Sequence, residues 1–122
     1  MIFDTRYFWI VFTEKNPGTL RKLRKIFEES KEPSVSSVSI YEIHKLTLQK
    51  EGKTVAELRT ATINKEFTVV DVSSQIAEEG ARIGHGLRVP MADALIMATA
   101  KSLGVACVSD DPHFTDVKKV WI

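Results

Sequence analysis

The chain has 122 residues, of which 43% are hydrophobic and 27% charged, and its formal net charge is +1. This length suits one compact domain, and the composition is that of an ordinary globular protein, which excludes disordered, fibrous and disulfide-rich classes. The charge balance excludes a basic field over the whole molecule, although an acidic site could offset a local basic surface in the total.

The first predicted elements are a short strand at residues 2–4 and a segment, residues 5–13, that is rich in aromatic and β-branched side chains. This segment could extend the strand or form a buried helix, and its pattern leaves both open. Asn16 and Pro17 predict the start of a helix, because an N-cap residue precedes proline at the first helical position. That helix should end near residue 31, before a second strand at residues 34–38.

Two matches to the capping box follow in the sequence. In this motif Ser or Thr caps a helix, and a Glu three residues later reaches back to it. Ser39 and Glu42 predict one such start, for a helix running to about residue 50, which Gly52 ends. Thr54 and Glu57 predict the start of the next helix.

Residues 67–72 predict a strand, and Ser73 or Ser74 is expected to cap the helix after it. The Gly-His-Gly sequence at residues 84–86 predicts a break in that helix, since glycine weakens helical structure. We therefore expect this helix to end before residue 87.

Pro90 predicts the start of a further helix, residues 91–103, which Gly104 ends. Residues 105–109 form a continuous apolar run, as in a strand buried within a parallel sheet. Residues 117–122 predict a last short strand. Because strands alternate with helices along the chain, we expect an α/β fold with a central, mainly parallel sheet, formed by a single domain over residues 1–122.

The sequence contains no membrane-span candidate and one cysteine. No stretch approaches the roughly 20 apolar residues of a membrane helix, and Asp4 and Arg6 interrupt the N-terminus before any long apolar region of the signal-peptide kind. Because Cys107 is the single cysteine, the chain can form neither a disulfide framework nor a thiolate metal cage. We expect Cys107 to be buried. We therefore expect a cytoplasmic protein without membrane contact.

Acidic residues stand at the ends of several predicted elements. Asp4 ends the first strand, Asp110 and Asp111 follow a later one, and Glu42 lies shortly after the second. Because ligands in parallel sheets bind beyond the carboxyl ends of the strands, these acids should share one edge. Asp93 lies in a helix whose neighbouring residues are nearly all apolar. Converging carboxylates repel one another unless a cation such as Mg²⁺ or Mn²⁺ compensates their charge.

Each acid also has a purely structural interpretation. Glu42 could complete a capping box, Asp93 could favour a helix N-terminus, and Asp4 could cap the following helix. Asp110 and Asp111 precede Pro112 and could belong only to a turn. These separate explanations would all have to hold at once, whereas a single site explains the positions of all the acids together.

Four segments together resemble PIN-domain ribonucleases in their order and spacing, and most closely the small VapC toxins of toxin–antitoxin pairs. These segments are Ile-Phe-Asp-Thr at residues 2–5, Ser-Val-Ser-Ile-Tyr-Glu-Ile at 37–43, Pro-Met-Ala-Asp-Ala-Leu-Ile-Met-Ala-Thr-Ala at 90–100, and Val-Ser-Asp-Asp-Pro-His-Phe at 108–114. The resemblance covers essentially the whole chain, and its most specific part is the Ala-Asp-Ala-Leu-Ile helix.

The resemblance implies a three-layer α/β/α sandwich and Mg²⁺- or Mn²⁺-dependent endonuclease activity on RNA. It also implies homodimers and inhibition by a VapB-like antitoxin. The family's four acids correspond to Asp4, Glu42, Asp93 and Asp111, which would hold the metal and act in catalysis. Asp110 is an extra acid without an assigned role.

Several other residues depart from the family or carry a weaker signal. Arg6 could contact a phosphate or a neighbouring carboxylate, and a plain surface role suits it equally well. His113 is unusual near the fourth acid, and we expect a surface role for it because metal-activated water needs no general base. The early helices supply basic and aromatic residues, for which a solvated face and core or dimer packing are the simpler interpretations: Arg21, Lys22, Arg24, Lys25, Phe8, Trp9 and Phe12.

Two other functions compete with a ribonuclease toxin. A signalling receiver domain also groups acids at strand ends, but it needs an acidic pair after the first strand, whereas Thr5 and Arg6 follow Asp4 here. A non-catalytic PIN-like binding protein would use the fold without turnover, and the full set of acids argues against it.

Overall fold

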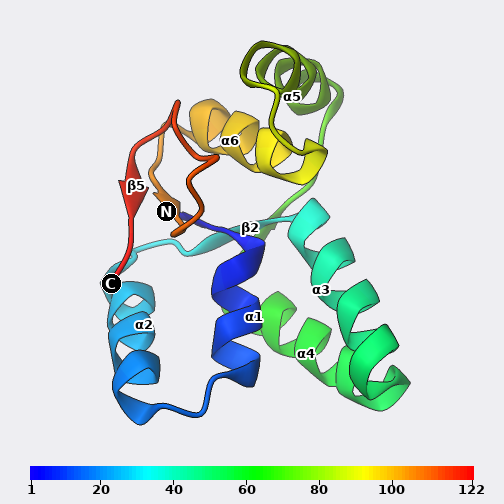
Figure 1. Ribbon diagram of the computed structural model, residues 1–122, viewed down its shortest axis with the longest axis vertical. Coiled ribbons are helices and arrows are strands. Elements are labelled where there is room, and N and C mark those ends of the chain that lie inside the picture. Colours follow the sequence, from blue (N-terminus) through cyan, green and yellow to red (C-terminus); the bar gives the residue numbers. More distant parts are fainter.

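The computed structural model describes residues 1–122 and contains five short strands and six helices (Figure 1). In chain order they are β1 (Ile2–Phe3), α1 (Thr5–Thr13), α2 (Pro17–Glu29), β2 (Ser34–Ser36), α3 (Ser37–Glu51), α4 (Lys53–Glu66), β3 (Thr68–Val70), α5 (Ser74–Leu87), α6 (Met91–Leu103), β4 (Cys107–Val108) and β5 (Lys119–Val120). None of these helices has the length and apolar character needed to cross a membrane.

All five strands are parallel and lie in the order β3-β2-β1-β4-β5. The central strand is β1, in which Ile2 pairs with Ser34 of β2 on one side and with Cys107 of β4 on the other. Parallel neighbours need long crossover connections, and helices provide them here. The predicted three-layer α/β/α sandwich around a parallel sheet is confirmed.

Successive residues of a strand face opposite sides of the sheet, and this alternation creates two cores. Ile2 and Cys107 belong to the core beneath α5 and α6, whereas Phe3 and Val108 belong to the core beneath α1, α2 and α4. Figure 1 shows α5 and α6 at one end of the molecule, well separated from α2 and α4. Cys107 is fully buried, as expected.

Residues 5–13, which the sequence left open between strand and helix, form helix α1. Tyr7 and Phe8 are both buried, and their rings pack edge-on against each other and against Phe67. A helix brings these successive aromatic residues to the same core, whereas a strand would point them to opposite faces.

The two predicted capping boxes are wrong. Helix α3 begins at Ser37, because Ser36 Oγ accepts a hydrogen bond from the Val38 N–H at 3.2 Å. Helix α4 begins at Lys53 after Gly52, whose φ of 89° lies in the left-handed region that favours glycine. In both cases the chain enters the helix before the serine or threonine of the motif.

The predicted break at residues 84–86 is also wrong, since α5 continues to Leu87. Two glycines cost a helix only about 1 kcal/mol each, which packing against α6 offsets. The helix ends where Arg88 adopts a left-handed φ of 55° and its N–H donates to the Gly84 carbonyl at 2.9 Å. The helix at residues 91–103 and its end at Gly104 are as predicted.

Candidate active site

Acidic side chains from four separate segments meet at the carboxyl edge of the sheet. Asp4 follows β1 directly, Asp111 lies three residues after β4, Asp93 is in the first turn of α6, and Glu42 is in the second turn of α3. The charges of Asp93 and Asp111 act on Asp4, and the charges of Asp111 and Glu42 act on Asp93. The structure therefore places all four acids that the family resemblance selects near enough for their charges to interact.

Asp4 is the most deeply buried of these acids, with 3% of its surface exposed. Burial raises the pKa of its carboxyl group to about 6 from 3.8, and the neighbouring negative charge of Asp93 adds to this rise. A hydrogen bond donated by Ser109 Oγ to Asp4 Oδ2, at 2.8 Å, opposes it. The side chain makes no capping hydrogen bond to α1, so a helix cap does not explain this residue.

Glu42 is held by a residue that the sequence analysis did not select. Thr5 Oγ1 donates a hydrogen bond to Glu42 Oε1 at 2.6 Å and lies 2.9 Å from Ser39 Oγ. Because α3 begins five residues earlier, at Ser37, Glu42 takes no part in its cap. Thr5 immediately follows Asp4, so one short segment both contains Asp4 and holds Glu42 through a hydrogen bond.

Asp93 is half-buried, and the pKa of its carboxyl group is raised. Burial is the main cause and the negative charge of Asp111 is the next, while the positive charge of His113 would lower it. A nearby cation would favour the ionised form of both Asp4 and Asp93.

The two acids of the doublet after β4 make different contacts. Asp110 forms a two-point ion pair with Arg6, with 2.6 Å between Nε and Oδ1 and 3.1 Å between Nη2 and Oδ2. This pairing raises the pKa of Arg6. Asp111 instead lies beside Asp93, and its N–H donates to Ser109 Oγ at 3.0 Å. Ser109 thus links Asp111 to Asp4, and Arg6 contacts a carboxylate, one of the two contacts considered for it.

His113 lies at the surface, as expected, but it also contacts two of the acids. Its side chain is 48% exposed, yet Nδ1 lies 3.1 Å from Asp93 Oδ2 and 2.9 Å from Asp111 Oδ1. The turn at residues 111–114 carries the ring back over the acids, because the Phe114 N–H donates to the Asp111 carbonyl and the Phe114 ring is buried. No local sequence pattern predicts the contact between His113 and Asp93, because the two residues lie in different segments.

The donor set fits a divalent ion. Asp93, Asp111 and His113 each offer one ligand atom, and these atoms lie within 4.8 Å of one another. The charge of Glu42 acts on Asp93, and the charges of Asp93 and Asp111 act on Asp4. Carboxylate oxygens are the ligands that Mg²⁺ and Mn²⁺ take in proteins. A bound cation would also relieve the repulsion that raises the pKa values of Asp4 and Asp93.

The basic residues of α2 are exposed and partly paired within their own helix. Arg24 Nε lies 3.1 Å from Glu28 Oε1, and Lys25 Nζ lies 4.0 Å from Glu29 Oε1, each four residues apart. A solvated helix face therefore explains these two residues without a nucleic acid.

A family model described as the PIN domain matches residues 1–120. A comparison with curated proteins finds no matching sequence.

Solved structures with a similar fold include a toxin–antitoxin complex from Klebsiella pneumoniae, with a TM-score of 0.78, 20% identity, and coverage of 98% of this chain and 94% of that chain. DNA-bound VapBC from Salmonella typhimurium gives a TM-score of 0.83 at 17% identity, covering 98% and 96%. Mycobacterium tuberculosis VapC20, a sarcin–ricin loop cleaving toxin, gives 0.72 at 19% identity, covering 93% and 92%. At these identities the likeness is one of fold.

Proposed function

We propose, because the chain belongs to the PIN domain family, that it is a metal-dependent endoribonuclease and the toxin of a type II toxin–antitoxin pair. The observation that carries this proposal is the meeting of four carboxyl groups from four segments, two of them with raised pKa values. Such a cluster costs stability in a protein that has no use for it. The toxins of similar fold support the assignment to a toxin.

We assign Asp4, Glu42, Asp93 and Asp111 to holding Mg²⁺ or Mn²⁺. When bound, such an ion lowers the pKa of a water molecule and offsets negative charge on the phosphate under attack. Hydrogen bonds within the chain hold two of these acids in place, since Ser109 Oγ donates to Asp4 and Thr5 Oγ1 donates to Glu42. These two hydroxyl residues are positioning residues.

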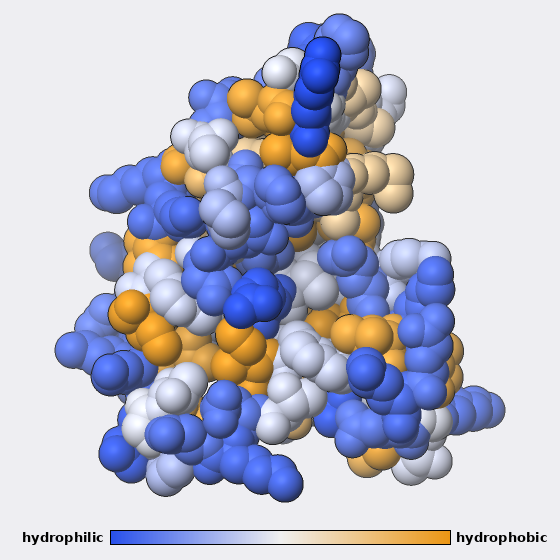
Figure 2. All heavy atoms as spheres, in the orientation of Figure 1, coloured by the Kyte–Doolittle hydropathy of each residue, from blue (hydrophilic) through white to orange (hydrophobic).

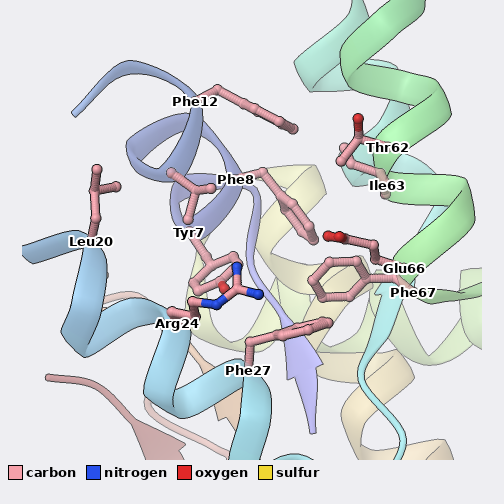
Figure 3. A pocket seen from close by; sticks show the side chains of 11 residues that line it. Tyr7, Phe8, Phe12, Leu20, Arg24, Phe27, Thr62, Ile63, Glu66 and Phe67 are labelled. Atoms are coloured by element: carbon pink, nitrogen blue, oxygen red, sulfur yellow. The ribbon is translucent and has the colours of Figure 1, made fainter. Parts of the chain in front are cut away.

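A VapB-like antitoxin is the proposed partner, and an apolar groove offers it a docking surface. The groove lies between α1, α2 and α4 and has a volume of about 290 Å³. Figure 3 shows Tyr7 and Phe8 pointing into it from α1, Phe27 from α2 and Phe67 from the end of α4. Apolar side chains on one face of an amphipathic segment would fill it. Replacing Leu20 at its rim by Glu should weaken antitoxin binding, whereas the exposed Lys22→Glu on the same helix should affect it far less.

We also propose a homodimer and a single domain over residues 1–122. Figure 2 shows hydrophobic side chains among hydrophilic ones at the α5–α6 end of the molecule and around α1. Large exposed apolar residues that could serve a dimer surface include Tyr41 and Leu48 on α3 and Met91 on α6. Sedimentation should show a dimer, and denaturant unfolding should show one cooperative transition whichever probe is used.

The test of function compares RNA cleavage by wild type, Asp4→Asn and Asp93→Asn in Mg²⁺, Mn²⁺ or EDTA. Asp71→Asn is the matched control, because Asp71 is an exposed acid at the end of β3 and outside the cluster. We expect cleavage by wild type and the control in metal only, and loss in both cluster variants. Cleavage that survives EDTA and both substitutions would refute the metal site. Metal binding without cleavage of any RNA would favour a non-catalytic binding protein.

A further inference from the structure

The imidazole of His113 lies against the acidic cluster in a way that family resemblance does not require. Its Nδ1 atom is 3.1 Å from Asp93 Oδ2 and 2.9 Å from Asp111 Oδ1. A nitrogen donor therefore stands among oxygen donors at the point where we place a divalent ion.

We infer that His113 is a nitrogen ligand of that ion and makes the site prefer Mn²⁺ to Mg²⁺. This inference rests on the metal site of the proposed function and adds to it a ligand and a metal preference. Mg²⁺ takes oxygen ligands almost exclusively. Mn²⁺ stands at the start of the first-row series whose members bind sites with nitrogen ligands, so an imidazole among the carboxylates favours Mn²⁺ over Mg²⁺.

The distances between donors agree with shared coordination. Two ligands at right angles, each about 2.1 Å from an octahedral ion, are roughly 3.0 Å apart. The separations from Nδ1 to the two carboxylate oxygens match this value, and all three donors lie within 4.8 Å of one another. His113 Nδ1 can therefore share an ion with both acids after only small shifts of the side chains.

The backbone around His113 is fixed by contacts that need no metal. The His113 N–H donates to Asp111 Oδ1 at 2.9 Å, and the Thr115 N–H donates to the His113 carbonyl at 3.0 Å. Phe114, the next residue, is buried in the core with 2% of its surface exposed. Contacts within the chain thus hold the turn so that the ring lies beside Asp93 and Asp111.

The remaining ring nitrogen is free to carry the proton. Nδ1 must be an N–H donor to hydrogen-bond the carboxylates, but it must be unprotonated to bind an ion. A neutral imidazole that binds an ion through Nδ1 carries its proton on Nε2. The side chain is 48% exposed, so water can accept a hydrogen bond from that N–H.

The competing explanation is that the ring only occupies the place of a cation and withdraws when one binds. Pulsed electron paramagnetic resonance of Mn²⁺ separates the two, because a bound imidazole nitrogen couples to the electron spin. Metal-stripped protein is titrated with MnCl₂ in three forms: wild type, His113→Gln, and His85→Gln as a control on the exposed surface of α5. Labelling histidine with ¹⁵N assigns any coupling to histidine.

We expect a histidine nitrogen coupling in wild type and in His85→Gln, and its absence in His113→Gln. Calorimetry should show Mn²⁺ affinity falling in His113→Gln by at least the roughly 10- to 100-fold typical of lost outer-shell partners of metal ligands, with a much smaller change for Mg²⁺. The wild-type spectrum is decisive even if His113→Gln fails to fold.

Mn²⁺ that binds to wild type without a histidine coupling would overturn the inference and leave the proposed function intact. The same coupling in His113→Gln would do so too. Failure of wild type to bind Mn²⁺ or Mg²⁺ at all would overturn the proposed metal site itself.

Discussion

Replacing Asp4 by Asn should stabilise the metal-free protein while removing its response to metal. The Asp4 carboxyl is buried, and its pKa is raised to about 6 from 3.8, mainly by burial. At neutral pH the fold must therefore hold an unfavourable negative charge. Asn has nearly the same shape, keeps an oxygen to accept the Ser109 hydrogen bond, and carries no charge.

The size of the effect follows from the pKa shift. Each unit corresponds to about 1.36 kcal/mol, so a shift of about two units corresponds to roughly 3 kcal/mol. Because the folded pKa lies above the unfolded one, the protonated form is favoured in the fold. Protonated Asp4 therefore adds its full contribution to the free energy of unfolding below about pH 4, and this contribution is lost as the pH rises to about 6. The advantage of Asp4→Asn should be absent at pH 3.5 and reach its full size above pH 6.

The assay is urea unfolding of EDTA-treated protein between pH 3.5 and 8, with thermal melts in parallel. A gain of roughly 3 kcal/mol would raise the melting temperature of a domain of this size by about 10 °C. Asp71→Asn, which changes an exposed carboxylate, should stay within about 0.5 kcal/mol of wild type. Saturating Mn²⁺ should stabilise wild type by about 2.7 kcal/mol at 100 times the dissociation constant, and Asp4→Asn far less. Loss of stability in metal-free Asp4→Asn at pH 7 would refute this reasoning.

Three further substitutions or probes test other parts of the structure. The Cys107 thiol, whose pKa is raised to about 12 by burial, should resist a thiol reagent in the native protein and react only on unfolding; rapid native labelling would contradict its burial. Gly86→Ala should stabilise α5 by roughly 0.4–1 kcal/mol in urea unfolding, because an added Cβ meets nothing within 4 Å, and a loss would show that the glycine is required. Ser109→Ala removes the hydrogen bond that favours ionised Asp4, so calorimetry should show weaker Mn²⁺ binding; unchanged affinity would deny Ser109 a positioning role.

The sequence predicted the fold well because its strongest signals are apolar runs and helix ends that do not depend on distant contacts. Asn16 and Pro17 begin α2, and Gly104 ends α6, as expected from local chemistry. The capping boxes failed because Ser-x-x-Glu and Thr-x-x-Glu also occur inside helices, where another residue makes the cap. Ser36 and Gly52 could be recognised only once the ends of β2 and α3 were known.

The acidic cluster could be predicted because it follows from strand ends in a parallel sheet. Asp4 and the doublet Asp110 and Asp111 needed only that topology, whereas the choice of Asp111 within the doublet and the place of Asp93 in the cluster depended on the family resemblance. The supporting contacts could not be predicted, since each joins segments far apart in the chain. Thr5 meets Glu42 across 37 residues, and His113 meets Asp93 through a turn that the buried Phe114 ring and backbone hydrogen bonds fix. The metal-binding and catalytic roles of these acids stay predictions.

The most direct test of the central claim is cleavage of a short RNA that carries a single 2′-deoxynucleotide at the preferred site. Water held at a metal centre needs no 2′-hydroxyl, whereas metal-independent ribonucleases attack through it. We predict that metal-stripped protein is inactive, that Mn²⁺ restores cleavage at the deoxy position, and that mass spectrometry finds no 2′,3′-cyclic phosphate among the products of unmodified RNA. Cleavage in EDTA that stops at the deoxy position and yields the cyclic phosphate would contradict the account.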